Sequence, residues 1–236
     1  VWPLPSEDAL AQYYADRFYA GPAAKEVAQH EQERQWYTEC VYGPIFDQCE
    51  HVLRSSGQKL RVCDIGPGSG VALDVARSHG WMTRGIEPDP ARCTALARRG
   101  HYLCVGTLAQ HTKCVKEHAP DIMVCWETLE HQICPEDFLL QCYDAMPRGA
   151  LVVLSVPNDF SVLQLAACTQ YTLPYYWVIP PVHLFYWTPK TLQLCVRRCG
   201  FTIHDLRGTY PMEQLMLEDD GQSYIGDSAQ WRLYTN

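Results

Sequence analysis

A glycine-rich turn beside an acidic residue is the feature whose residue types and spacing point most directly to chemistry. Gly66, Gly68 and Gly70 alternate with other residues just after Asp64 and the apolar segment that contains it. Glycines let the backbone turn tightly and let a ligand approach it closely. A helix that begins after the turn would offer free N–H groups and a partial positive charge to that ligand.

A second acidic residue lies where it could complete a nucleotide site. Glu87 lies 21 residues after Gly66, at the end of the next apolar segment, and Pro88 follows it. A carboxylate in this place can accept hydrogen bonds from both hydroxyls of a ribose. Dinucleotide binding requires G-x-G-x-x-G or a final alanine, whereas Val71 stands at that last position. We therefore predict a ribose-containing ligand without a pyrophosphate, with NAD as the alternative.

Candidate acid–base residues follow other predicted strands. Glu127 and His131 come after the apolar segment 121–126, and His183 lies at the end of an aromatic-rich segment. Histidine has an unperturbed pKa of about 6.5, so either ring could accept a proton near neutral pH. The alternative for His131 is a loop histidine that bonds the backbone and shapes the pocket. The alternative for His183 is a structural cap on the aromatic segment.

Aromatic and amide side chains could line a pocket for a second, acceptor molecule. Aromatic walls suit a planar ring or the face of a sugar, and an amide can bond a hydroxyl group. The alternative is that many of these rings are local hydrophobic core. The candidate substrate-binding residues are Asn158, Tyr176, Trp177, Tyr186 and Tyr14.

Alternating apolar strands and amphipathic helices position these residues. The pattern predicts a doubly wound, mostly parallel α/β sheet. We expect a helical cap over residues 1–57, with helices at 7–20 and 24–54, and a ligand-binding domain over 58–236 with an inserted loop region at 160–187 that forms a lid. Strands are predicted at 61–65, 82–87, 102–105, 121–126, 151–156 and 201–207, and helices at 71–79, 90–99, 136–146 and from Pro189 to Gly200.

The composition limits the partners and the compartment. The chain has 236 residues with 19 basic and 27 acidic side chains, a net charge of -8. Gripping nucleic acid through its phosphates needs clustered Lys and Arg, so we expect no nucleic-acid partner. No apolar run approaches the ~18 residues that span a bilayer. The 12 cysteines fall inside predicted strands and helices, so we expect mostly free thiols in a cytoplasmic protein of unknown oligomeric state.

Several segments resemble the class I S-adenosylmethionine (SAM)-dependent methyltransferases. R-V-C-D-I-G-P-G-S-G at 61–70 is similar to their first motif, and G-I-E-P-D at 85–89 to their second. D-I-M-V-C-W-E-T-L-E-H at 121–131 resembles the fourth strand and loop of the ubiquinone-biosynthesis O-methyltransferase group. H-L-F-Y-W-T-P-K-T-L at 183–192, followed by R-R-C-G-F at 197–201, resembles a late segment of small-molecule methyltransferases.

The resemblance implies a Rossmann-like methyltransferase with a seven-stranded sheet, SAM as cofactor and S-adenosylhomocysteine (SAH) as product. By position, the glycine turn and Asp64 would hold the methionine end of SAM, and Glu87 its ribose. Thr107 and Leu108 stand where the family often has an aspartate that reads adenine, so that contact would differ here. The implied cofactor-binding residues are Asp64, Gly66, Gly68, Gly70, Glu87, Pro88, Thr107, Leu108, Trp126 and Glu127.

The resemblance also implies a small-molecule acceptor. We expect O-methylation of a phenolic or sugar-like hydroxyl, with His183, His131 and Glu127 as candidate catalytic residues. The alternatives are N-methylation and a catalytically silent SAM-binding scaffold. In the ubiquinone-type group, positions matching Glu127, Glu130 and His131 are associated with a divalent metal. Carboxylates near a sulfonium could equally neutralise its charge, and we favour a site without metal.

Overall fold

The computed structural model describes residues 4–6, 9–10, 13, 28, 31–54, 57, 59–208, 213–214 and 217. The chain divides into two compact units, residues 1–156 and 157–236. Tyr14 and most of the predicted helix 7–20 lie outside the described residues.

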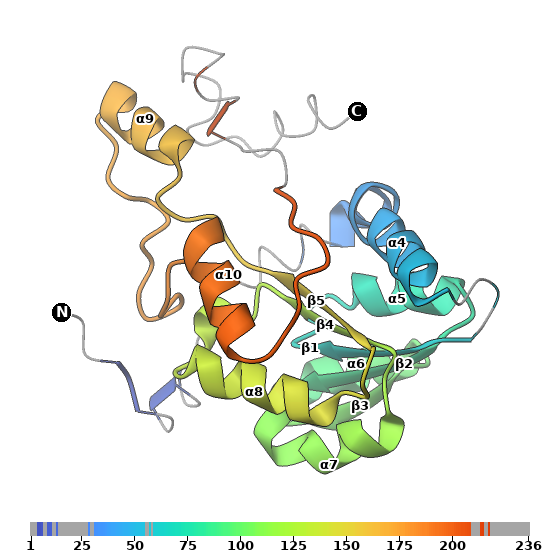
Figure 1. Ribbon diagram of the computed structural model, residues 1–236. Helices are drawn as coiled ribbons and strands as arrows, with labels where there is room; N and C mark the ends of the chain where they lie inside the picture. The colour runs from blue at the N-terminus through green and yellow to red at the C-terminus, as the bar shows by residue number, and fades with distance from the viewer. Residues whose placement is uncertain are drawn as a thin grey trace. The chain divides into compact units, whose positions relative to one another are not determined.

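A parallel sheet of five strands forms the centre of the first unit (Figure 1). The strand order is β3-β2-β1-β4-β5, so the chain reverses its direction of progress across the sheet between β3 and β4. Glu87, the last residue of β2, pairs with Val105 of β3, and Asp64 of β1 pairs with Gly85 of β2. The strands are β1 (Arg61–Ile65), β2 (Met82–Glu87), β3 (Tyr102–Val105), β4 (Ile122–Trp126) and β5 (Leu151–Ser155).

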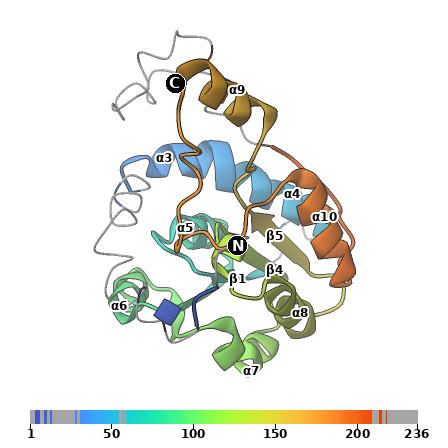
Figure 2. The ribbon, with the colours of Figure 1, turned by 90° about the vertical axis from the view of Figure 1, so that its left-hand side faces the viewer.

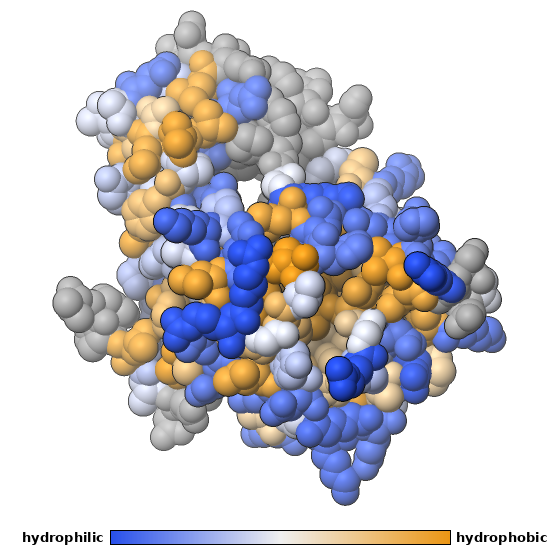
Figure 3. All heavy atoms as spheres, viewed as in Figure 1, coloured by the Kyte–Doolittle hydropathy of each residue, from blue (hydrophilic) through white to orange (hydrophobic). Residues whose placement is uncertain are grey.

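Helices cover both faces of this sheet. Helices α4 and α5 lie on one face and α7 and α8 on the other (Figures 1 and 2). The surface over α7, at the bottom of the view, is largely hydrophilic (Figure 3). The helices of this unit with described bounds are α3 (Arg34–Trp36), the π-helix η2 (Tyr37–Tyr42), α4 (Gly43–Leu53), α5 (Val71–Ser78), α6 (Pro90–Arg98), α7 (Leu108–His118), the 3-10 turn η3 (Leu129–His131) and α8 (Pro135–Ala145).

The predicted α/β alternation is confirmed from β1 to β5, and local residue chemistry explains it. At the start of α6, the Asp89 carboxylate accepts a hydrogen bond from Ala91 N at 2.8 Å, and Pro90 occupies the first helical position. Aspartate at the N-cap and proline just after it are the preferred residues there. Four residues of β4, from Ile122 to Cys125, are fully buried, as a central parallel strand covered on both faces requires.

The N-terminal helices share a hydrophobic core with the sheet. Phe46 of α4 is fully buried among side chains of β1, α5 and β4. Burying a side chain of this size stabilises the fold by roughly 1.5–3 kcal/mol. The residues of this cluster include Val41, Tyr42, Phe46, Cys49, Val62, Val71, Ala72, Val75, Ala76, Ile122 and Val124.

A π-helical segment, which the sequence prediction did not include, precedes α4. Its last hydrogen bond runs from Gly43 N to Thr38 O, five residues back instead of four. Pro44 follows, and a proline inside a regular helix lacks an N–H and clashes with the carbonyl four residues earlier, here that of Cys40. We attribute the wider helix to Pro44, and it sets the direction in which Tyr42 points.

Two helices of the second unit have described bounds, α9 (Val162–Tyr171) and α10 (Pro189–Arg198). Helix α9 corrects the prediction that residues 160–187 form an inserted loop region. Ser161 begins it with a cap, since its hydroxyl accepts a hydrogen bond from Gln164 N at 3.1 Å. The predicted cap at Thr188 is confirmed by its bond from Thr191 N at 3.2 Å. Apolar residues on several sides of α9 explain why the helical period was not recognised.

The described residues form five strands, and this does not confirm the predicted seven. Residues 201–207, predicted as a strand, have no assigned strand structure, and no described residue pairs with them. A strand requires a hydrogen-bonding neighbour. Strand β5 is half-buried throughout because it is the outer strand of the described sheet.

Two predictions from composition can be compared with the structure directly. All twelve cysteines are free, as predicted. Within the described part of the chain, no helix combines the length and the apolar character needed to cross a membrane.

Candidate functional site

The glycine turn connects the end of β1 to the start of α5, as predicted. Gly66 has φ +74°, and its N–H donates to Ile86 O at 2.9 Å. A side chain at this position would require the left-handed backbone region and would place Cβ 3.1 Å from the Thr128 hydroxyl. Gly70, also at φ +74°, precedes the first residue of α5. The turn therefore needs glycine for its backbone conformation and is open to a ligand at Gly68, where an added Cβ would meet no side chain within 4 Å.

Two buried carboxylates flank this turn. Asp64 is 2% exposed and Glu87 is 1% exposed, at the carboxyl ends of the neighbouring strands β1 and β2. Asp64 Oδ1 is buried and has no hydrogen-bond partner in the structure. Burial, and then the charge of Glu87, raise the pKa of Asp64 to about 8. A buried carboxylate without a partner is unfavourable, so the site is arranged to receive a donor or a cation.

The other predicted cofactor residues lie at the same end of the sheet. Glu87 Oε1 accepts a hydrogen bond from Asp89 N at 3.0 Å across the exposed Pro88. Thr107 is the N-cap of α7, and its N–H donates to Gln110 Oε1 at 2.9 Å. Leu108, the first residue of α7, is 3% exposed. Thr107 thus has a capping role, whether or not it also contacts adenine.

Trp126 ends the fourth strand and Glu127 follows it, near a residue that the sequence prediction missed, Tyr42. The rings of Tyr42 and Trp126 are in edge contact, with centroids 5.1 Å apart. Burial raises the pKa of Tyr42 well above its usual value, and the nearby carboxylates of Asp64 and Glu127 raise it further. The Gly43–Pro44 pair interrupts the helical pattern after Tyr42 and is the sequence signal that could have identified this residue.

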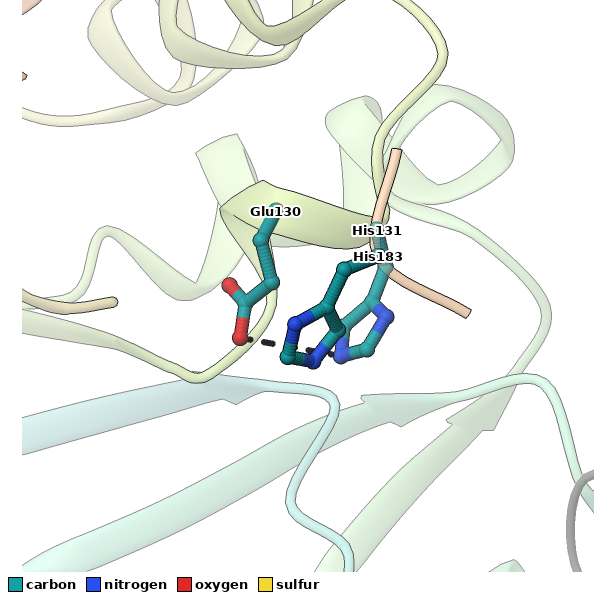
Figure 4. Close-up of side chains that lie close together, drawn as sticks. All are labelled: Glu130, His131 and His183. Atoms are coloured by element: carbon teal, nitrogen blue, oxygen red, sulfur yellow. Dashed lines mark ion pairs between the residues drawn. The ribbon is translucent and has the colours of Figure 1, made fainter. Parts of the chain in front are cut away.

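The segment after β4 contains Glu127, Glu130 and His131, the residues considered above as metal ligands. Glu127 is exposed, has φ +48° and donates its N–H to Ser155 O at 3.0 Å. Glu130 is fully buried, and one of its oxygens lies 3.7 Å from His131 Nε2 (Figure 4). The structure thus brings Glu130 and His131 together as an ion pair when the imidazole is protonated, and Glu127 points to the surface from the same segment.

Arg99, at the end of α6, is a second missed residue. Its guanidinium donates to Ser69 O at 2.7 Å and to Gly70 O at 3.3 Å, and also bonds the Asp74 carboxylate. Arg34 and His101 bond the same carboxylate, the latter at 2.9 Å. Arg99 therefore joins the carbonyl groups of the glycine turn to an ion network on α5.

Residues predicted to bind the acceptor and described here lie in the second unit. Trp177 is 7% exposed and contacts the rings of Tyr175, Tyr176 and Phe160 at 5.0–5.4 Å. The Tyr176 hydroxyl donates to Glu213 Oε1 at 2.6 Å.

His183 and Asn158 belong to this second unit too. The half-buried His183 accepts a hydrogen bond at its carbonyl from the Tyr186 hydroxyl at 3.2 Å, and Asn158 is exposed. Their roles toward an acceptor stay predictions.

A family model described as a methyltransferase domain matches residues 29–206. The chain belongs to this methyltransferase family. It is a SAM-dependent methyltransferase, and the matched range contains the glycine turn, Glu87, Tyr42 and Arg99.

Curated relatives at low identity are named as ubiquinone biosynthesis O-methyltransferases. The protein from Histophilus somni (strain 2336) is 24% identical over 173 residues, which cover 65% of this chain and 73% of the relative. The protein from Sodalis glossinidius (strain morsitans) is 29% identical over 138 residues, which cover 53% of this chain and 55% of the relative.

A solved structure supports the fold. Magnesium protoporphyrin IX methyltransferase from Synechocystis PCC 6803, with bound SAH, gives a TM-score of 0.59 at 11% identity and covers 87% of this chain and 94% of its own. At this identity the likeness concerns the fold alone.

The methyltransferase site fits SAM by its own chemistry. The unpartnered Asp64 oxygen suits the ammonium group of the methionine end, and Glu87 suits the ribose hydroxyls. The glycine turn leaves room beside these carboxylates, and the helix α5 that follows presents its N-terminus. NAD, the alternative, is disfavoured by Val71 at the start of α5, since dinucleotide binding requires a glycine or alanine there.

Proposed function

We propose that this methyltransferase transfers a methyl group from SAM to a hydroxyl group of a small phenolic or sugar-like acceptor. The observation that carries the proposal is the pair of buried carboxylates, Asp64 and Glu87, beside a glycine turn at the carboxyl ends of β1 and β2. Ligands of open α/β sheets bind at this edge, next to the point where the strand order reverses.

The binding residues would act by holding the cofactor in one orientation. Asp64 would accept from the ammonium group, Glu87 from the ribose, and Gly66 and Gly68 would let the backbone approach. SAM supplies an already activated methyl group when bound, so the protein contributes position and proton removal. Tyr42, Trp126 and Glu127 would surround the methionine end at the carboxyl end of β4.

Three residues remain candidates for the base that accepts the acceptor's proton. His131 lies beside the buried Glu130 carboxylate, which would stabilise a protonated imidazole. Glu127 is exposed at the end of β4, and His183 lies in the second unit. The single replacements His131→Ala, His183→Ala and Glu127→Gln test these candidates. The variant that lacks the base should turn over about 100-fold more slowly, at the lower end of the range for general-base catalysis, and should keep its affinity for SAH. If all three variants keep full turnover, positioning alone suffices and the base proposal is wrong.

We prefer a mechanism without metal. A buried carboxylate and an adjacent imidazole are ligand types that a divalent cation accepts. The 3.7 Å contact between Glu130 and His131 explains their proximity without a metal, because the two side chains can form an ion pair with each other. Turnover that is unchanged in excess chelator supports the metal-free mechanism. Loss of turnover on chelation, restored by Mg²⁺ or Mn²⁺, would overturn it.

O-methylation is favoured over N-methylation because both curated relatives are named as O-methyltransferases. A screen with methyl-labelled SAM should therefore compare phenols and catechols, sugars, and amines of similar size. Transfer to a hydroxyl acceptor supports the proposal, and exclusive transfer to amines supports the alternative. Tight SAH binding without transfer to any acceptor would indicate a silent scaffold. Calorimetry that detects no binding of SAM or SAH would reject the cofactor assignment itself.

A further inference from the structure

A hollow of about 380 Å³ opens in the first unit at the end of the sheet opposite to the glycine turn. Met82, the first residue of β2, and Tyr102, the first residue of β3, line it, whereas the turn follows the last residue of β1. The hollow is therefore separate from the proposed cofactor site. It plays no part in the methyl transfer argued above.

The hollow is cationic in a chain whose net charge is -8. Arg77, Arg84 and His118 line it from α5, β2 and α7, and none of its lining residues, all of which are described, is acidic. The three nitrogen-bearing side chains thus converge from three different elements. A positive concavity on an acidic protein concentrates small anions.

Two polar atoms in this hollow are buried without a hydrogen-bond partner. They are Arg84 Nε, which can only donate, and His118 Nε2. The rest of the Arg84 guanidinium is fixed, because one NH2 group donates to Cys114 O at 2.7 Å and the group stacks on the Tyr102 ring, 4.4 Å from its centroid. His118 is 9% exposed and has a backbone hydrogen bond with Val62. Unpartnered buried polar atoms are rare in folded proteins, and two in one hollow indicate a missing ligand.

We propose that this hollow binds the phosphate group of a small metabolite. A tetrahedral oxyanion offers several acceptor oxygens, which match donors arriving from Arg84 and Arg77, and from His118 when its imidazole is protonated. Arg84 holds a fixed direction through Cys114 and Tyr102, so its Nε–H is pre-oriented toward the anion. Arg77 is exposed at the rim and would contribute charge.

The ionisation of His118 makes the proposal specific. Burial lowers the pKa of His118 most, and the charges of Arg84 and Arg61 lower it further, against the backbone hydrogen bond with Val62 and the charge of Asp121. The imidazole is therefore neutral at pH 7 in the free protein. An anion beside it would favour the protonated form, so anion binding should strengthen as the pH falls.

The test is calorimetric titration of the full chain with sulfate at constant ionic strength, because the charge of sulfate does not change between pH 5 and 8. We expect saturable binding that strengthens from pH 8 to pH 5, and that weakens about tenfold or more in Arg84→Gln, the loss of a charge-assisted bond. Inorganic phosphate should compete with sulfate, whereas acetate at the same concentration should not. Saturating SAH should leave sulfate binding unchanged.

Matched variants distinguish binding in this hollow from nonspecific effects of removing a positive charge. Arg148→Gln removes an exposed arginine that does not line the hollow and should keep sulfate affinity. His118→Gln should keep binding but remove its pH dependence. If Arg84→Gln does not fold, as judged by lost SAH binding, the exposed Arg77→Gln replaces it, with an expected weakening of several-fold. The proposal is overturned if sulfate binding does not saturate, if the arginine variants leave it unchanged, or if SAH displaces it.

Discussion

At the scale of single residues, the site depends on carboxylates held in a state that is unfavourable without a ligand. Asp64 is buried beside Glu87 with one oxygen unpartnered, and its pKa is raised to about 8. The sequence identified both residues, because their spacing around the glycine turn is a local pattern. The sequence did not show that Asp64 lacks a partner, because that depends on every neighbour packed around it.

The variant Asp64→Asn should bind SAH more weakly and, without ligand, should be more stable than the unchanged protein. Removing the negative charge should weaken SAH binding about tenfold or more, since hydrogen bonds to charged groups contribute roughly 1.5–3 kcal/mol. The same change should stabilise the ligand-free protein near pH 8, because a neutral amide is cheaper to bury than a carboxylate. Calorimetry with SAH and thermal unfolding measure the two effects, and Asp144→Asn, at an exposed position on α8, is the control. A loss of stability together with lost binding would point to a purely structural role.

Tyr42 is a residue of the site that the sequence prediction missed and the structure places beside Trp126. Tyr42→Phe keeps the ring that packs on Trp126 and removes the hydroxyl near Asp64 and Glu127. We expect turnover or SAH affinity to fall several-fold while the melting temperature stays within about two degrees, since the buried area is unchanged. Tyr143→Phe, on the exposed side of α8, should change neither quantity. Equal SAH affinity and equal turnover in Tyr42→Phe would show that the hydroxyl has no part in the site.

At the scale of elements, the strands could be predicted better than the helices. Strands β1 to β5 have short apolar or β-branched runs between turn residues, and the predicted bounds differ from the observed ones by at most one residue. Helix α7 was not predicted, because its exposed side is polar and few of its positions are buried. The π-helix before Gly43 depends on a single proline, and helix α9 has apolar residues on several sides. The hydrophobic period of the sequence identifies neither element.

The packing of α6 against the glycine turn leads to a prediction for Arg99. Arg99 bonds the carbonyl groups of Ser69 and Gly70 from the end of α6, so it fixes the turn from outside the cofactor site. Arg99→Ala should weaken SAH binding several-fold through a looser turn. Arg98→Ala, one residue earlier and exposed, removes the same charge without these bonds and should bind SAH normally. Equal affinities in the two variants would mean that the glycine turn holds its conformation by itself.

At the scale of the whole molecule, one sheet separates two chemically different ends. The carboxyl ends of β1 and β2 carry buried acids, and the hollow at the amino ends of β2 and β3 is lined by two arginines and a histidine from α5, β2 and α7. The net charge of -8 did not reveal this separation, because composition averages over both ends. The sequence did not identify the acceptor either, since Tyr176 and Trp177, two of the aromatic residues proposed to bind it, pack on each other in the second unit.

Whole-molecule stability should record the buried acid through its pH dependence. Between pH 6.5 and 8 the unfolded chain has ionised Asp64, whose ordinary pKa is about 3.9, while the folded chain without ligand keeps it protonated up to about pH 8. The folded state then binds one more proton, so its stability falls as the pH rises, by up to about 1.4 kcal/mol per pH unit.

His101 acts in the opposite direction and at lower pH. Burial, followed by the charges of Arg99, Arg77 and Arg34, lowers its pKa to about 4. Below pH 6.5 the unfolded chain therefore binds the extra proton, and this contribution to stability is lost as the pH falls toward 4. Above pH 6.5 this opposing effect fades as the unfolded imidazole loses its remaining proton, so the change in stability up to pH 8 reports mainly Asp64, and comparison with Asp64→Asn isolates its share.

Denaturant unfolding at half-unit steps from pH 6.5 to 8 should show a decline of about 1–2 kcal/mol in the ligand-free protein. Asp64→Asn should flatten the decline. Saturating SAH should flatten it too, because a ligand ammonium group beside Asp64 keeps the carboxylate ionised at every pH in the interval. A decline that persists unchanged in Asp64→Asn would assign it to another group and would remove the argument that this carboxylate is held ready for a cation.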